Sequence, residues 1–438
     1  MDSSPLHAES PKKAWLINRN YAFLWSGQAI SNLGDMVFDT TLVLWVSTKI
    51  AAHQSWAPLA ISGVMLSAAL PTLLIGPLAG VFTDRWDKRR TMLLMDFSRA
   101  LFVLLLFVAA LPLPLHISPS ATLTMIYAMV ALNATCSQFF APARTTLIRD
   151  TVEAKDQARA GGLAQVSQNL AIIIGPPLAA PLLFVVGVEW ALLINALSFV
   201  VSFFAILMVR SHKIVEPEGQ KDHGQLSFWS ELRAGLTFFG HSQILMTLLI
   251  CITIVTLGTG MMNVLDVFFV TRNLHVDSSL YGLIGMGFGA GSILGAVIST
   301  FFTQRLEVVR TFWGCLVMAG LLIFAYSRMT SFIPALMIFT IVGIPIAALN
   351  TAFFPLLLHA TPREMLGRVL SVINPTQTLA ALVSTLLAGF LASQFSFHTS
   401  VLGSNFGTID TIFSGGALMI ILGGVYALVT LSHIRLDE

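Results

Sequence analysis

Two aspartates lie four residues apart in the first long apolar segment of the chain. Asp35 lies near the middle of residues 22–47, and Asp39 follows one helical turn later, so both carboxyl groups share one helix face. A central aspartate costs about 2.5–3.5 kcal/mol in a membrane unless it is paired or protonated. Because neighbouring carboxylates discourage joint ionisation, we expect this pair to take up and release a proton. Alternatively, Asp39 reaches the outer membrane interface and is solvated there.

A second charged pair, Asp96 and Arg99, lies within the apolar segment 91–112. The i, i+3 spacing predicts an ion pair. We expect this pair to join Asp84 and Arg85, which precede the segment, in a latch at the inner membrane surface. Proton transfer by Asp96 is the alternative.

Other polar residues at membrane depth are candidates for a central cavity that binds a small molecule. They are Asn133, Gln165, Gln168, Asn263, Asp266, Asn350, Asn374 and Gln377. Amide side chains also join membrane helices by hydrogen bonds, and Asp266 lies near the end of its segment, where water can solvate it. Both interpretations therefore stay open for each residue.

Several other chemistries find no support in the sequence. We see no phosphate-binding loop, metal-ligand cluster or nucleophile–base set, so we expect no enzymatic activity, no cofactor and no metal. Cys136, Cys251 and Cys315 lie far apart in apolar segments and are expected to be packing residues. The net charge of +2 argues against nucleic-acid binding.

The composition indicates that lipid surrounds much of the chain. Of its 438 residues, 55% are hydrophobic and 11% are charged, whereas soluble domains carry about 25% charged residues. A bilayer core requires about 20 apolar residues per helix. The apolar runs predict an all-α membrane protein with twelve transmembrane helices. These helices are expected over residues 22–47, 58–82, 91–112, 120–140, 162–186, 189–209, 243–268, 279–301, 309–327, 332–356, 369–392 and 412–432.

The basic residues orient these helices. With both termini in the cytoplasm, Lys49, Arg272 and Arg328 lie outside and Arg99 lies within a helix, which leaves the remaining twenty of the 24 Lys and Arg residues inside. The positive-inside rule therefore predicts a multi-pass membrane protein with cytoplasmic termini. The polar first residues do not form a cleavable signal peptide.

A polar stretch divides the helices into two sets of six. The expected parts are a cytoplasmic segment (1–21), a first bundle (22–209), a cytoplasmic linker (210–242), a second bundle (243–432) and a cytoplasmic tail (433–438). Within the linker, residues 228–239 show helical spacing of apolar side chains. They form either an amphipathic helix on the membrane surface or the entry to the seventh span.

Faint repeats relate the two bundles. The pair Gly76 and Gly80 recurs 215 residues later as Gly291 and Gly295. The triplet Phe140-Ala141-Pro142, expected to close the fourth helix, recurs 213 residues later as Phe353-Phe354-Pro355. Similar offsets in the same order indicate duplicated, pseudo-symmetric halves.

The stretch from Gly76 to Arg90 is the most specific motif. Two glycines four apart permit close helix packing, and the charged residues after Thr83 fit a turn at the membrane surface. This pattern resembles the loop signature between helices 2 and 3 of the major facilitator superfamily. Asp87 stands where the general pattern has glycine, which resembles the macrolide-efflux branch. The segments Trp25–Ser31 and Leu366–Ser371 are similar to macrolide-efflux and siderophore exporters.

The resemblance implies a function. It implies a monomeric secondary exporter of an amphipathic, drug-like molecule in a bacterial inner membrane, with two rocking bundles and a contribution to antibiotic resistance. The expected coupling is to H⁺ entry, and Na⁺ is the alternative coupling ion. Siderophore or lysolipid export is the alternative, and a non-transporting membrane receptor is a third possibility. A cytoplasmic gate is also implied, and its residues are Gly76, Gly80, Asp84, Arg85, Arg89, Asp96 and Arg99.

Two positions depart from the pattern of drug exporters. Asn133 stands where many of them carry an arginine in helix 4, so Asp35 lacks that cation unless Arg99 turns toward the cavity. In helix 5, Gly175-Pro176-Pro177 is present, but alanines replace two common glycines. This step is either a structural kink or an antiporter-specific seal.

Overall fold

The structure is a computed structural model, and it describes residues 17–111, 118–210, 237–240, 242–305, 307–362, 365–395, 399–401 and 404–431. Residues 1–16 of the predicted N-terminal segment, most of the linker including most of its possible amphipathic helix, and the tail lie outside these residues. The boundaries expected for the cytoplasmic parts therefore remain predictions.

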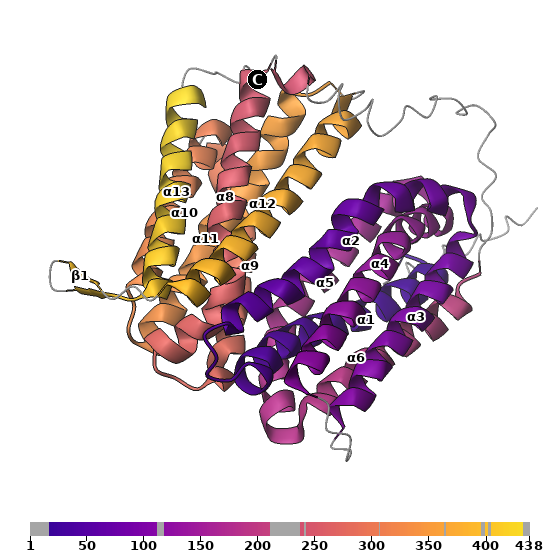
Figure 1. Cartoon of the computed structure of the whole chain (residues 1–438). Helices are drawn as coiled ribbons and strands as arrows, with labels where there is room; N and C mark the ends of the chain where they lie inside the picture. The colour runs from indigo at the N-terminus through magenta and orange to yellow at the C-terminus, as the bar shows by residue number, and fades with distance from the viewer. Residues whose placement is uncertain are drawn as a thin grey trace, which may run out of the picture.

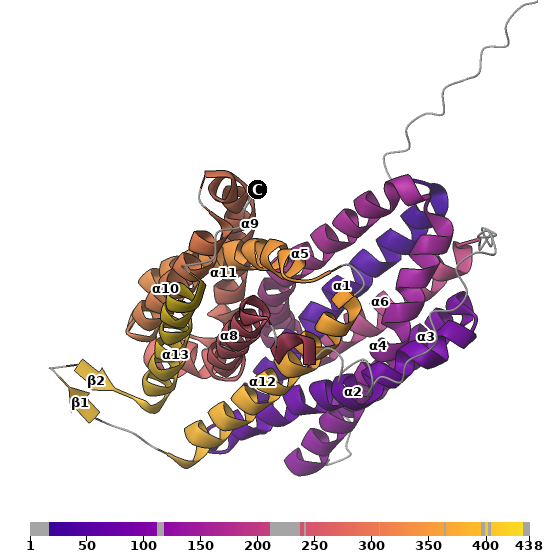
Figure 2. The same cartoon turned by 90° about the horizontal axis from the view of Figure 1, so that it is seen from above.

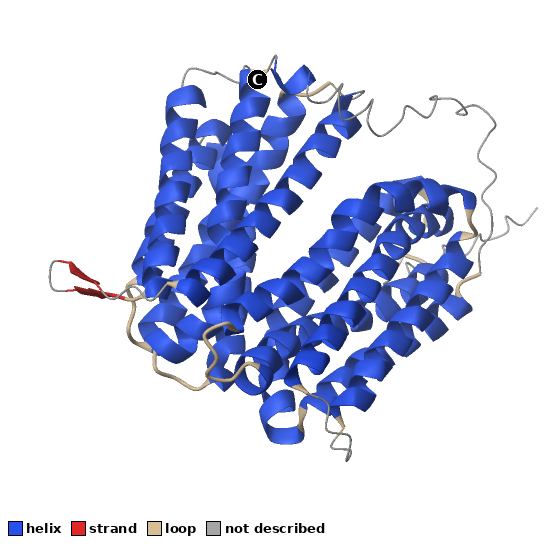
Figure 3. Cartoon of the chain, viewed as in Figure 1, coloured by secondary structure: helices blue, strands red, loops and turns tan. Residues whose placement is uncertain are grey.

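Twelve long helices make up most of the described chain (Figures 1 and 3). The first six are α1 (Arg19–Trp45), α2 (Ala57–Arg85), α3 (Lys88–Ala110), α4 (Pro119–Thr151), α5 (Gln157–Pro181) and α6 (Val188–Met208). The other six are α8 (Gln243–Phe268), α9 (Tyr281–Arg305), α10 (Val308–Ser327), α11 (Phe332–His359), α12 (Leu366–Gln394) and α13 (Thr408–Leu431). An unpredicted antiparallel hairpin of β1 (Thr399–Val401) and β2 (Ser404–Phe406) precedes α13.

Each predicted span corresponds to one of these helices, which confirms the fold class. Within the described residues, eleven helices are long and apolar enough to cross a membrane. The twelfth, α1, is not among them, because its interior carries Asp35, Asp39 and several amides that lower its mean hydropathy. One expectation was wrong: α4 continues through Pro142 to Thr151, and α11 continues through Pro355 to His359. Polar residues ended the apolar run of α4 without ending its helix.

Local chemistry explains how α3 begins. Asp87, the departure from the general loop pattern, is the N-cap of α3, and its carboxylate accepts a hydrogen bond from the Arg90 amide at 2.7 Å. Aspartate is a preferred N-cap because it satisfies a backbone N–H that has no partner within the helix. The residue that distinguishes this loop therefore fixes the point at which the chain turns back into the membrane.

The two faces of α3 have opposite surroundings. Leu94 and Phe97 are about 60% exposed on the outer face (59% and 60%), where lipid surrounds a membrane protein. Asp96 and Arg99, on the opposite face, are 0% and 6% exposed. The 3.6-residue period of the helix thus directs the two charged side chains into the first bundle.

The helices pack as two bundles that touch at one end. Within the first bundle α1 packs on α5 and α6, and within the second α9 packs on α11. Between bundles α2 packs on α12 and α5 packs on α9. The bundles diverge toward the end that carries the C-terminus and meet at the opposite end (Figure 1), and Figure 2 shows α12 beside α2. The hydroxyl of Ser62 donates to the Thr385 carbonyl at 2.7 Å in this contact.

The Gly-Pro step of α5 lies at the second bundle contact. Gly175 lies against Met36 of α1, and Gly282 of α9 lies so close to the Pro176 carbonyl that a Cβ would overlap it. The step therefore has a packing role between bundles, as a seal requires, while α5 remains helical through Pro181.

Candidate functional site

A polar pocket lies inside the first bundle, between α1, α3, α4 and α5. Its volume is about 280 Å³. Apolar side chains such as Phe38 and Val130 form part of the wall. The polar residues of the lining are Asn32, Asp35, Asp39, Arg99, Asn133, Ser137 and Gln168.

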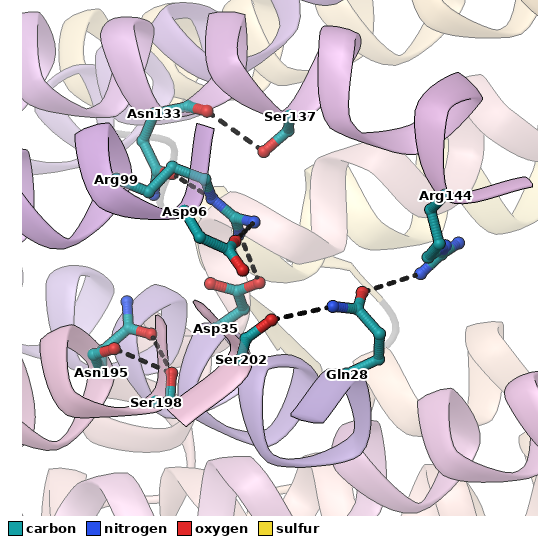
Figure 4. A network of polar contacts seen from close by, with 10 residues as sticks. All are labelled: Gln28, Asp35, Asp96, Arg99, Asn133, Ser137, Arg144, Asn195, Ser198 and Ser202. Atoms are coloured by element: carbon teal, nitrogen blue, oxygen red, sulfur yellow. Dashed lines mark hydrogen bonds and ion pairs between the residues drawn. The ribbon is translucent and has the colours of Figure 1, made fainter. Parts of the chain in front are cut away.

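Arg99 joins three elements in this pocket (Figure 4). Its Nη2 donates to Asp35 Oδ2 at 2.9 Å, and its Nε donates to Asn133 Oδ1 at 2.9 Å. Its Nη1 lies 3.6 Å from Asp96 Oδ1. The guanidinium also lies 4.0 Å from the ring centre of Phe199, a cation–π contact. A planar fork with five donors can make these contacts at once, whereas an ammonium cannot.

The charges in this pocket do not balance. Asp35 and Asp39 line the pocket and Asp96 lies beside it, and among the described residues Arg99 is the cation that pairs with Asp35 and Asp96. Asp96 is fully buried, whereas the Asp35 side chain is 26% exposed and Asp39 is exposed along the pocket wall. Unpaired charge is costly away from water. The site can therefore complete its charge balance with a proton or with a cationic group of a ligand.

The Asp96–Arg99 pair forms as its spacing predicted, but it does not form a surface latch. α3 starts at Lys88, so Arg99 lies about three turns inside the bundle. Arg85 is exposed at the end of α2, and the side chain of Asp84 is outside the described part of the structure. Arg99 therefore belongs to the pocket, where its partners are Asp35, Asn133 and Asp96.

Arg89 has a different partner from the one expected. It donates from Nε to the Ile206 carbonyl at 3.2 Å and from Nη2 to the Leu207 carbonyl at 2.5 Å. These carbonyls end α6, where basic side chains satisfy unpaired acceptors and the helix dipole. Gly76 lies near Gln138, and a Cβ at Gly80 would meet no atom within 4 Å. The close packing expected at Gly80 is thus absent in this conformation.

The position of Asn133 resolves the question of the missing arginine. Asn133 does not leave Asp35 without a cation, because its side-chain oxygen holds Arg99 against Asp35. The charge that related exporters place on helix 4 comes here from α3.

The remaining cavity candidates separate into two groups. Gln168 lines the pocket, and Gln165 lines an adjoining one. The rest are in the second bundle, where Asn263, Asn350 and Asn374 are exposed and Gln377 is half-buried. None of these four lines the pocket around Asp35.

The position of Asp266 decides against one of its two interpretations. It is 8% exposed, and it accepts a hydrogen bond from the Tyr326 hydroxyl at 3.1 Å. Solvation at the membrane interface is therefore wrong for this residue, because α10 covers it.

Sequence reasoning missed several polar residues of this region. Asn32 lines the pocket one turn before Asp35, and this i, i+3 spacing was a usable signal. Gln28 donates to Ser202 Oγ at 3.0 Å, and Arg144 of α4 donates to Gln28 Oε1 at 3.5 Å. Arg144 was counted only as one of the inner basic residues.

Comparisons with known proteins agree with this architecture. The family model described as transmembrane secretion effector, a family of the major facilitator superfamily, matches residues 11–421. The chain belongs to this family. It is 22% identical over 427 residues to the MFS-type transporter YkuC of Bacillus subtilis (strain 168), covering 94% of this chain and 93% of the relative. It is 20% identical over 380 residues to macrolide efflux protein A of Streptococcus pyogenes, covering 86% and 90%.

Solved structures of transporters share the fold of this family member. A bacterial homolog of the human lysosomal transporter Spinster, in an inward-facing and unoccupied conformation, superimposes with a TM-score of 0.68 at 15% identity. The match covers 95% of this chain and 96% of that one. The protein is thus a transporter with efflux-pump relatives.

Proposed function

We propose that this family member is a secondary exporter of amphipathic, drug-like small molecules, driven by proton entry across a bacterial inner membrane. The observation that carries the proposal is the Asp35–Arg99 ion pair in a pocket that Asp39 also lines. Relatives that are efflux proteins support the direction of transport.

Proton exchange follows from the contacts of Arg99. A proton on Asp35 removes the charge that holds Nη2 at 2.9 Å and leaves Asn133 and Asp96 as the remaining partners of the guanidinium. Loss of the proton restores the pair. Since both aspartates line the pocket, a bound substrate and a proton use the same carboxyl groups. Their binding is therefore mutually exclusive or strongly coupled, which is the condition for antiport.

Alternating access follows from the bundle contacts. With cytoplasmic termini, the divergent end faces the cytoplasm and the contacts of α2 with α12 and of α5 with α9 close the outer side. The opposite state closes the inner end, where the segment from Gly76 to Arg89, which joins the end of α2 to the start of α3, forms the cytoplasmic lock. Asp84 and Arg85 are the charged residues placed for that contact.

The test is export driven by an imposed pH gradient. A drug-susceptibility panel in an efflux-deficient bacterium first identifies a transported compound. Proteoliposomes that contain the purified protein are then loaded with that compound. We expect transport to accelerate under an inward proton gradient and to slow when a protonophore collapses the gradient. Transport that follows a Na⁺ gradient instead, or that ignores both gradients, would contradict proton coupling.

A further inference from the structure

A second pocket adjoins the first in the same bundle. It lies between α1, α4 and α5, has a volume of about 130 Å³, and shares Asn32 and Gln168 with the pocket around Asp35. Its other polar residues include Arg144, Gln28 and Gln165. The two pockets thus form neighbouring compartments with different charges, because Asp35 and Asp39 line only the first and Arg144 lines only the second.

Arg144 is poorly satisfied in this second pocket. Its one hydrogen bond in the described structure is the 3.5 Å contact from Nη1 to Gln28 Oε1, and it makes no ion pair with any described carboxylate (Figure 4). Arg99, by contrast, contacts Asp35, Asn133 and Asp96. A half-buried guanidinium carries five donors and a full charge, and removing them from water without a counter-ion is unfavourable. The pocket therefore lacks an anion.

The other walls suit the apolar part of a ligand next to its head group. Tyr21 donates its hydroxyl to the Ala160 carbonyl at 2.7 Å, and Trp25 donates Nε1 to the Leu163 carbonyl at 3.0 Å. Both polar ends are occupied, so the rings present apolar surface to the pocket. A drug-sized ligand needs about 300–1,000 Å³, so this pocket holds a head group and the first pocket holds more of the molecule.

We propose that Arg144 forms an anion subsite that binds the carboxylate or phosphate group of an amphipathic substrate. This inference rests on the proposed export function and names the substrate class: amphiphiles with an acidic head group. The guanidinium would hold two oxygens of that group in bidentate geometry, as arginine does with carboxylates and phosphates.

Equilibrium binding tests the subsite without a gradient. The full chain in phosphatidylcholine nanodiscs is titrated by calorimetry with dodecyl phosphate and with dodecanol, which has the same chain and no charge. We expect Arg144→Gln to weaken dodecyl phosphate about 10-fold or more and to leave dodecanol unchanged. Arg144→Lys keeps the charge but lacks the planar guanidinium, so its affinity for dodecyl phosphate should lie between those of the wild type and Arg144→Gln. Arg149→Gln is the matched control, because Arg149 is exposed on the same helix and lines neither pocket.

Two outcomes would overturn the subsite. Unchanged affinity of Arg144→Gln for dodecyl phosphate would remove Arg144 from anion binding. An equal loss for dodecanol would assign the effect to the fold. Two competition experiments then distinguish a free anion from a lipid head group as the natural ligand. Competition by inorganic phosphate supports a free anionic group, and competition by phosphatidylglycerol in the nanodisc supports a lipid head group.

The outcome of this binding test is independent of the outcome of the transport test of the proposed function. Binding of dodecyl phosphate needs no proton gradient, so unchanged binding in Arg144→Gln would leave proton-driven export by Asp35 intact. Conversely, a transporter that ignores the gradient could still bind the anion through Arg144.

Discussion

The two bundles have the same helical plan and bury different chemistry. The first surrounds Arg99 with Asp35, Asp96 and Asn133 beside an open polar pocket. In the second, Asp266 is hydrogen-bonded by Tyr326, and that ring packs between Phe269 and Phe339 at centroid distances of 4.8 Å and 4.6 Å. An ion pair beside a pocket can exchange partners, whereas a buried carboxyl group whose tyrosine partner is packed between two other rings cannot do so without repacking. The difference supports the proposal that proton exchange takes place in the first bundle.

The repeated glycines also differ between the bundles, in how closely other atoms pack against them. Gly80 of α2 has open space around it, whereas a Cβ at Gly295 of α9 would lie 2.5 Å from the Ile344 carbonyl oxygen. The repeated glycine motif therefore serves tight packing within the second bundle and leaves a free surface on the first.

The largest expected effect is at Arg99. Arg99→Gln leaves Asp35 and Asp96 without their cation, so we expect gradient-driven transport to fall by about two orders of magnitude or more, as for loss of a buried charge partner worth about 3–5 kcal/mol. Arg310→Gln is the control, because Arg310 is in the second bundle and makes an exposed ion pair with Glu307. Initial rates in proteoliposomes measure both. Near-normal transport by Arg99→Gln, at equal protein incorporation, would remove the contrast between the bundles.

The next largest effect is expected on stability, when alanine replaces the equivalent glycines Gly80 and Gly295. Gly295→Ala should destabilise the protein by about 1–3 kcal/mol, because the added methyl overlaps the backbone of α11. Gly80→Ala should be neutral or slightly stabilising in the conformation of this structure, since no atom lies within 4 Å of the added Cβ. Thermal unfolding in detergent compares them. If Gly80 packs against the other bundle when the inner side closes, Gly80→Ala will also favour the open state, which spin-label distances across that face would show. Equal melting temperatures for the two variants would contradict the packing difference.

Tyr326→Phe sharpens the account of the second bundle. It removes the hydroxyl that donates to Asp266 and keeps the ring, so we expect a loss of about 1–3 kcal/mol in stability. Because this carboxyl group lies outside the exchange site, the dependence of export on the pH gradient should not change. Chemical or thermal unfolding and vesicle transport measure the two properties. A changed gradient dependence would mean that Asp266 takes part in coupling.

The smallest effect concerns the caps of equivalent helices. Asp87 caps α3 through its side chain, whereas Glu307 stands at the same place before α10 without a side-chain cap hydrogen bond. Asp87→Ala should cost about 1 kcal/mol in stability, and Glu307→Ala should cost less. Melting temperatures of the two variants decide this. A larger loss for Glu307→Ala would reverse the expected order.

The positions of the helices could be predicted from the sequence more fully than the contacts of the pocket residues. Apolar runs located all twelve spans, because burial in lipid requires length and hydropathy that are visible locally. The end of α4 was missed, since a helix can continue beyond the bilayer with polar residues such as Arg149. Asp35 was predicted as a site residue because it lies near the middle of an apolar segment. The pairing of Arg99 with Asp35 was predicted only as one possibility, because it depends on how α3 turns against α1, and spacing along one helix indicates only the contact with Asp96. Arg144 was overlooked for the same reason: sequence shows a charge but not the pocket around it.

Proton flux compared between the bundles tests the central claim most directly. Proteoliposomes that contain a trapped pH indicator report the protons that enter when a transported compound leaves. We expect Asp35→Asn to abolish compound-driven proton entry, because the amide keeps the shape of the carboxyl group and cannot exchange a proton. Asp266→Asn should retain it. Normal proton entry with Asp35→Asn, or its loss only with Asp266→Asn, would contradict the assignment of proton exchange to the first bundle.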